Sequence, residues 1–204
     1  MQQIWKRIES WTAANTDGDL ALRPGATDAE LVALETAMGR RLPDDLRESF
    51  LIHDGQDMPS VRWFDGERRL HPLASIAEQW QHDSSETEVP DALTEDERAR
   101  IAMFHHGRLP LIGVRFWDGD TLYADFIPGP AGRDGQLVYR MDIEFSVAAH
   151  SWREFLGEYA RKLEAGELVY HKGVALYPEA KGCIIKPGAD LTYGHDVLAT
   201  FSVA

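Results

Sequence analysis

The sequence predicts an α+β domain with N-terminal helices, a mainly antiparallel sheet over about residues 60–148, a helix packed on that sheet and a small appended β-rich tail. Three observations predict this class. The apolar spacing changes from helical to alternating after Gly55. A turn rich in glycine and proline, residues 128–135, separates two strand-like runs and leaves no room for a crossover helix. A wide apolar stripe with helical spacing then follows Ser151.

Length and cysteine content favour one main domain in a reducing compartment. The chain has 204 residues, of which 44% are hydrophobic, and a single cysteine, Cys183, which excludes an internal disulfide framework. The opening "MQQIWKRIESW" has charged residues within its apolar pattern, and no segment reaches the roughly 20 apolar residues of a membrane span. We therefore expect a soluble protein in the cytoplasm.

Three helices are predicted within the first 55 residues. The first covers about residues 2–14. The second begins at a capping box formed by Thr27 and Glu30 and ends at Gly39, and the third opens with Pro43 in its first turn. The apolar residues that define the three faces are Ile4, Ile8 and Trp11; Leu31, Leu34 and Met38; and Leu46 and Phe50.

The pair His53-Asp54 at the end of the third helix has two interpretations. His53 falls on the apolar face of the last turn, where packing and helix-end chemistry account for it, and Gly55 follows. Alternatively, His53 and Asp54 could join His105 and His106 in a metal-dependent phosphohydrolase. Zinc-type histidine spacings are absent, and the second half of the chain has strand patterns rather than those of a helical bundle. We expect His53 to be structural.

The middle of the chain predicts strands around one short helix. The stretch "SVRWFDGERRLHPL" has the pattern of a hairpin with its turn at Asp65-Gly66, and a helix is expected over about residues 73–81. Three strand-like runs follow from Arg108. Within them apolar and polar positions alternate: Leu122, Ala124 and Phe126 against Thr121, Tyr123 and Asp125, and then Leu137, Tyr139 and Met141.

The last predicted helix begins at a second capping box, Ser151 with Glu154, and continues to about residue 165. Its apolar stripe should pack on the sheet. Residues 166–204 contain short apolar runs between glycines and form the predicted tail. The expected organisation is one domain over residues 1–165 and an appendage of unknown role over residues 166–204.

Charge is the strongest compositional bias. The 21 basic and 34 acidic residues give a net charge of −13, which disfavours nucleic acid and anionic membranes and favours a cationic partner. Residues 83–97 contain seven acidic residues and no basic one, which is typical of a solvated loop or insertion. Simple solubility is the alternative explanation of this charge. The residues predicted to contact a partner are Glu86, Glu88, Asp91, Glu95, Asp96, Glu97, Asp118, Asp120 and Asp134.

No motif for catalysis, a metal or a cofactor stands out. A Gly-x-Ser-x-Gly elbow is absent, and the glycine-rich "GPAGRDG" is not followed by the Gly-Lys-Ser/Thr of a phosphate-binding loop. We therefore predict a protein that is not an enzyme and needs no cofactor.

Four stretches of the sequence carry a family resemblance: "IWKRIESW", "LRPGATDAELVALETAMGRRLPDDLRESFLIHDGQ", "LPLIGVRFWDGDTLYADFIPGPAGRDGQLVYR" and "SWREFLGEYARKLEAG". Together they resemble the SUKH superfamily, in its group similar to the fungal cell-wall-assembly regulator (Smi/Knr-type). The acidic segment 83–97 and the tail after residue 165 depart from the family pattern. The resemblance implies an immunity protein that binds and neutralises a cognate secreted antibacterial toxin, such as a nuclease with a basic surface. A regulatory scaffold for protein interactions and the phosphohydrolase are the other two hypotheses.

Overall fold

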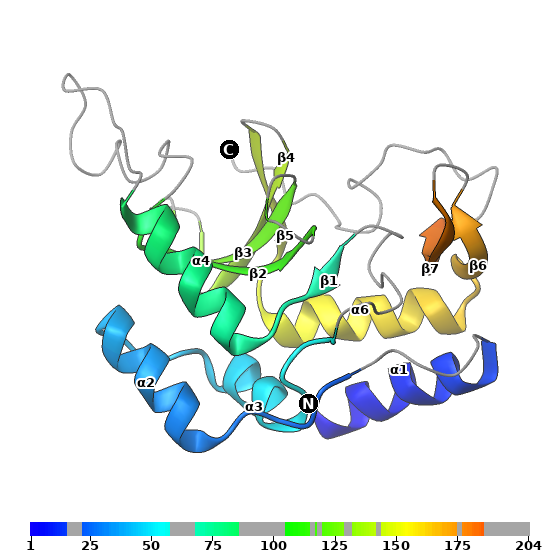
Figure 1. The fold of residues 1–204 in the computed structure, drawn as a ribbon, viewed down its shortest axis with the longest axis horizontal. Helices are drawn as coiled ribbons and strands as arrows, with labels where there is room; N and C mark the ends of the chain where they lie inside the picture. Colours follow the sequence, from blue (N-terminus) through cyan, green and yellow to red (C-terminus); the bar gives the residue numbers. More distant parts are fainter. Residues whose placement is uncertain are drawn as a thin grey trace.

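The computed structural model describes residues 1–15, 22–57, 68–85, 105–114, 117, 120–128, 132–141, 144–174 and 177–185. The described helices are α1 (Gln2–Asn15), α2 (Asp28–Met38), α3 (Asp44–Ile52), α4 (Leu73–Ser85) and α6 (Trp152–Glu164). The strands of the main sheet are β1 (Arg69–Leu70), β2 (Arg108–Gly113), β3 (Thr121–Asp125), β4 (Gln136–Met141) and β5 (Glu144–Ala149). In the main part of the molecule the helices pack below the sheet, and α1 lies on the far side of α6 (Figure 1). This confirms the predicted α+β class.

The main sheet is antiparallel throughout, in the order β1-β2-β3-β4-β5. Strands β3 and β4 form a hairpin. Asp125 pairs with Gln136 at the end of the hairpin next to the turn, and Thr121 pairs with Arg140 at the open end. The glycine- and proline-rich connection therefore joins antiparallel neighbours, as predicted.

Helix α6 lies between the sheet and α1 (Figure 1), in contact with β4 and β5 on one side and with α1 and α3 on the other. Ser151 caps its first turn, and its hydroxyl accepts a hydrogen bond from the Glu154 amide. The Glu154 carboxylate, however, reaches the amide of His150 rather than that of Ser151. The predicted apolar stripe is fully buried: Trp152, Phe155, Leu156, Tyr159 and Leu163.

The N-terminal helices follow their local signals. Both hydrogen bonds of the Thr27–Glu30 capping box are present, and Gly39 ends α2 in the left-handed conformation. At the start of α3, Pro43 stands just before the first helical residue, where its fixed φ suits the entry into a helix. These ends confirm the predicted helix boundaries within a residue or two.

The sheet has two buried faces rather than one. Leu122 and Ala124 belong to the main core, whereas Tyr123 packs with Val138 and Val147 on the opposite face. All five residues of β3 are buried. The predicted alternation is therefore correct in register, but the polar positions do not face solvent.

The acidic segment begins later than the charge pattern indicates. Helix α4 continues to Ser85, beyond the predicted end at about residue 81, so residues 83–85 are helical and not part of a loop. Asp83 is buried, and burial raises the pKa of its carboxyl group. Residues 86–97 and the turn of the predicted 60–73 hairpin lie outside the described residues.

The described part of the tail is a two-stranded antiparallel hairpin, β6 (Leu168–Val174) with β7 (Tyr177–Ile185). This confirms its β-rich character up to residue 185. Leu168 is 2% exposed and belongs to the main hydrophobic core. None of the described helices combines the length and the apolar character required to cross a membrane.

Candidate functional site

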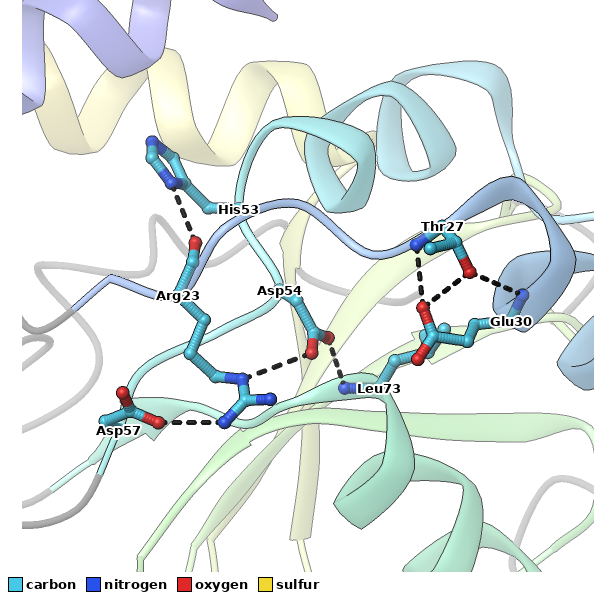
Figure 2. A network of polar contacts seen from close by, with 7 residues as sticks. All are labelled: Arg23, Thr27, Glu30, His53, Asp54, Asp57 and Leu73. Atoms are coloured by element: carbon cyan, nitrogen blue, oxygen red, sulfur yellow. Dashed lines mark hydrogen bonds and ion pairs between the residues drawn. The ribbon is translucent and has the colours of Figure 1, made fainter.

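Asp54 is the centre of a polar network that joins three parts of the fold (Figure 2). Its Oδ1 accepts a hydrogen bond of 2.7 Å from the amide of Leu73, the first residue of α4. Its Oδ2 accepts one of 3.2 Å from Nε of Arg23, whose Nη1 also contacts Asp57. The carboxylate thus caps α4 from a distant part of the sequence and fixes the segment that leads into α2.

His53 ties α1 to the same network. Its Nε2 lies 2.6 Å from Oε1 of Glu9 in α1, and its Nδ1 lies 3.2 Å from the carbonyl oxygen of Arg23. The ring also packs edge-on against the buried Trp5, with centroids 4.9 Å apart. These contacts occupy both ring nitrogens, so the geometry is that of a structural histidine.

Gly55 lets the chain turn from α3 toward the sheet. Its φ is +70°, and a Cβ there would lie 2.5 Å from the carbonyl group of His71. Directly after it, Gln56 exchanges two hydrogen bonds with Leu70 of β1, one through its amide and one through its side chain. The stretch 53–56 therefore locks the helices onto the edge of the sheet.

A second carboxylate network surrounds Asp120. Its Oδ2 accepts hydrogen bonds from Arg68 at 2.7 Å and from the hydroxyl of Tyr139 at 3.0 Å. Burial raises the pKa of the Tyr139 hydroxyl, which therefore stays protonated and serves as a donor. This carboxylate acts as a bridge between β4 and the segment before β1.

A third network is buried on the sheet face that carries Tyr123. Asp125 lies 3.6 Å from Nε of Arg108 and accepts a 3.1 Å hydrogen bond from Gln136. Arg108 also stacks over the ring of Phe145, and burial lowers the pKa of its guanidinium group. Because both charged groups are buried and paired with each other, we interpret this network as structural.

Of the predicted partner-binding residues, the structure describes two. Asp120 is held by Arg68 and Tyr139 as above, and Asp134 forms an exposed ion pair with Arg40 at 2.7 Å. Asp120 precedes β3 and Asp134 precedes β4, so the antiparallel register places them at opposite ends of this hairpin. They do not form one continuous patch. The remaining seven lie outside the described residues and stay predictions: Glu86, Glu88, Asp91, Glu95, Asp96, Glu97 and Asp118.

The phosphohydrolase hypothesis receives no support from the described geometry. His53 and Asp54 are engaged in the structural contacts above, and His105 accepts a hydrogen bond from the amide of Gly107. Burial, with smaller effects of His106 and Arg108, lowers the pKa of His105 to about 4. Across the part of the chain that the structure describes, no three histidine, cysteine or carboxylate side chains are grouped as a metal would require.

One concave feature was not predicted from the sequence. A shallow depression of about 390 Å³ lies between α1 and the end of α6. Its lining residues are Lys6, Arg7, Ser10, Trp11 and Glu164. The helical pattern of α1 predicts that Lys6, Arg7 and Ser10 are exposed, but no local signal in the sequence brings Glu164 beside them.

Sequence comparison finds a family model and several relatives. The model of the SMI1 / KNR4 family (SUKH-1) matches residues 25–158. The cell wall biosynthesis/cell cycle regulator smi1 of Schizosaccharomyces pombe is 29% identical over 192 residues, covering 82% of this chain and 37% of the relative. The glucan synthesis regulatory protein of Neurospora crassa is 27% identical over 206 residues, covering 79% and 38%. The cell wall assembly regulator SMI1 of Saccharomyces cerevisiae is 25% identical over 205 residues, covering 79% and 40%.

Fold and site together define an α+β domain whose described histidine and carboxylate networks hold its elements together. The chain belongs to the SMI1 / KNR4 family (SUKH-1), as the resemblance in the sequence predicts. It spans about 37–40% of the length of these curated relatives. These relatives are named as regulators and not as enzymes.

Proposed function

We propose that this chain is a regulatory protein-binding domain that acts by holding a protein partner and not by catalysis. The observation that carries the proposal is the family match over residues 25–158, together with relatives named as regulators of cell wall assembly or glucan synthesis. These relatives support a regulatory role better than the toxin-immunity role that the sequence resemblance first implied.

The contacts of His53 and Asp54 support a binding role over a catalytic one. A general base or nucleophile needs a side chain that is free to meet a substrate. His53 and Asp54, the residues with the strongest catalytic pattern in the sequence, are instead held by Glu9, Arg23 and Leu73. Recognition at the protein surface requires no such free group.

A chimera tests the proposal. The region of the S. pombe regulator that aligns with this chain is replaced by residues 1–204, and the cells are scored for sensitivity to a glucan-degrading enzyme. We expect the chimera to restore resistance above that of cells lacking the regulator. A chimera with Gly55→Ala, which should destabilise the fold, is the control and should restore less resistance. A stable chimera that leaves cells as sensitive as the deletion would contradict the proposal.

Toxin immunity is the more specific alternative, and the net charge of −13 is the observation that favours it. An acidic inhibitor would be steered toward the basic cleft of a nuclease. Changing Glu86, Glu88, Asp91 and Glu95 to lysine should then slow association and weaken binding by about tenfold or more. The measurement is protection of cells that express a toxin encoded beside this gene. Unchanged protection would remove the electrostatic hypothesis.

We also propose a cytoplasmic location and no affinity for nucleic acid, on the basis of the single cysteine and the acidic charge. Fluorescence of a fusion protein in the cells that make it checks the location. Association with the cell envelope would contradict it.

A further inference from the structure

The depression between α1 and α6 contains hydrogen-bond donors that have no acceptor among the residues that the structure describes. The two helices run side by side along the lower part of the molecule (Figure 1). Glu164 of α6 is already engaged in two hydrogen bonds, of 2.8 and 2.6 Å, from Arg7. Within the described part of the chain, the Lys6 ammonium, the Ser10 hydroxyl and the Trp11 indole N–H make no hydrogen bond or ion pair.

The charges of this depression select a single carboxylate. Two cations, Lys6 and Arg7, and one anion, Glu164, leave one net positive charge. That charge balances one carboxylate and falls short of a phosphate monoester, which carries about −1.5 to −2 at neutral pH. In the same depression, the half-buried indole of Trp11 adds an apolar side chain with a polar N–H.

We propose that this depression binds a short acidic segment of a protein partner, with a carboxylate on Lys6 and a neighbouring apolar side chain on Trp11. The inference rests on the proposed function, because it names one place where a partner is held. A strongly acidic segment would be repelled by the chain's net charge of −13, so the site favours one carboxylate next to an apolar residue.

The depression lies outside the central part of the family match. All five lining residues fall outside residues 25–158, the range that matches the family model. They come from the first and last helices of the domain, within the stretches 4–11 and 151–166.

A peptide titration tests the inference on the full chain. The probe is acetyl-Gly-Phe-Asp-Gly-amide, and the readout is the NMR resonance of the Trp11 indole N–H. We expect a saturable shift, weakened about threefold to tenfold by Lys6→Met, since the variant removes the cation of a charge-assisted hydrogen bond. The matched control is Arg133→Met, which removes an exposed cation that does not line the depression and should leave binding unchanged.

Two further probes separate the sources of the anion. The Asn analogue of the peptide should bind more weakly than the Asp form, and acetate or inorganic phosphate alone should not saturate the site at peptide concentrations. Equal binding of the Asp and Asn peptides, an unaffected Lys6→Met variant, or equal binding of a free anion would overturn the inference. A chimera that restores resistance while the peptide fails to bind would refute this site and leave the regulatory function intact. Peptide binding with a failed chimera would refute the regulatory function alone.

Discussion

His71 is a residue whose neutral state the fold requires. Its Nε2 donates to the carbonyl oxygens of Gly113 and Val114, its Nδ1 lies 3.3 Å from the Ser75 hydroxyl, and the Trp117 ring stacks on it with centroids 3.7 Å apart. Trp117 takes a φ of +59° to reach this position. Burial lowers the pKa of His71 to about 4.

This shift predicts a loss of stability in mild acid. In the unfolded state the histidine has a pKa of about 6.5, whereas in the folded state His71 becomes protonated only near pH 4. Because the unfolded state binds the proton more readily, the free energy of unfolding falls as the pH drops from about 6.5 to about 4. We expect the wild type to lose about 2 kcal/mol more between pH 7 and pH 5 than His71→Gln does. Denaturant unfolding at the two pH values measures the difference. Equal losses would show that other groups control the pH dependence.

His53 should contribute to stability and not to partner binding. His53→Ala removes the contacts with Glu9, the Arg23 carbonyl and the Trp5 ring, and we expect the free energy of unfolding to fall by about 1–3 kcal/mol. Peptide affinity at the α1–α6 depression, measured by the same titration, serves as the control and should not change. A variant as stable as the wild type would contradict the structural role.

At the scale of elements, two glycines that follow helices offer a matched comparison: Gly39 caps α2, and Gly55 lies three residues after the end of α3. Gly39 and Gly55 have nearly equal φ values, +68° and +70°. A Cβ on Gly39 meets nothing within 4 Å, whereas one on Gly55 would collide with the backbone of His71 and Pro72. The two positions therefore separate backbone strain from steric exclusion.

We expect Gly39→Ala to cost about 1 kcal/mol, the usual penalty of the left-handed conformation, and Gly55→Ala to cost about 3 kcal/mol or more. Thermal and denaturant unfolding of the two variants checks the ranking. Similar losses in both would mean that the collision at residue 55 is relieved by a shift of β1.

The elements that local signals define were predictable, and those that depend on distant partners were not. The capping box at Thr27 and the stop at Gly39 lie within a few residues of the helix that they delimit, so the sequence contains the whole signal. Asp54 was assigned to a helix end, but its partner Leu73 is 19 residues away. Asp83 was assigned to a solvated loop because its neighbours are acidic, and only tertiary packing shows that it is buried.

At the scale of the whole molecule, the boundary between domain and tail is not sharp. The sequence pattern places it at residue 165, yet Leu168 belongs to the main core. Removal of a buried leucine typically costs about 2–5 kcal/mol. A chain of residues 1–165 should therefore be folded but less stable than a chain of residues 1–169 by about 2 kcal/mol or more, as measured by denaturant unfolding with circular dichroism. Equal stability would support residue 165 as the boundary.

The strand order of the sheet has a consequence for how quickly the protein reaches its native state. Strands β2 to β5 are neighbours in space in the order in which they occur in the chain, so each pairing closes a short loop. The network of His53 and Asp54 instead joins α1 and α4 to the segments around Arg23 and Asp54, which lie far apart in the chain. We expect substitutions of buried residues in this meander, such as Leu111→Ala, to slow refolding, and Asp54→Ala mainly to accelerate unfolding. Stopped-flow experiments measure both rates. If the Asp54 network formed first, Asp54→Ala would slow refolding and Leu111→Ala would mainly accelerate unfolding.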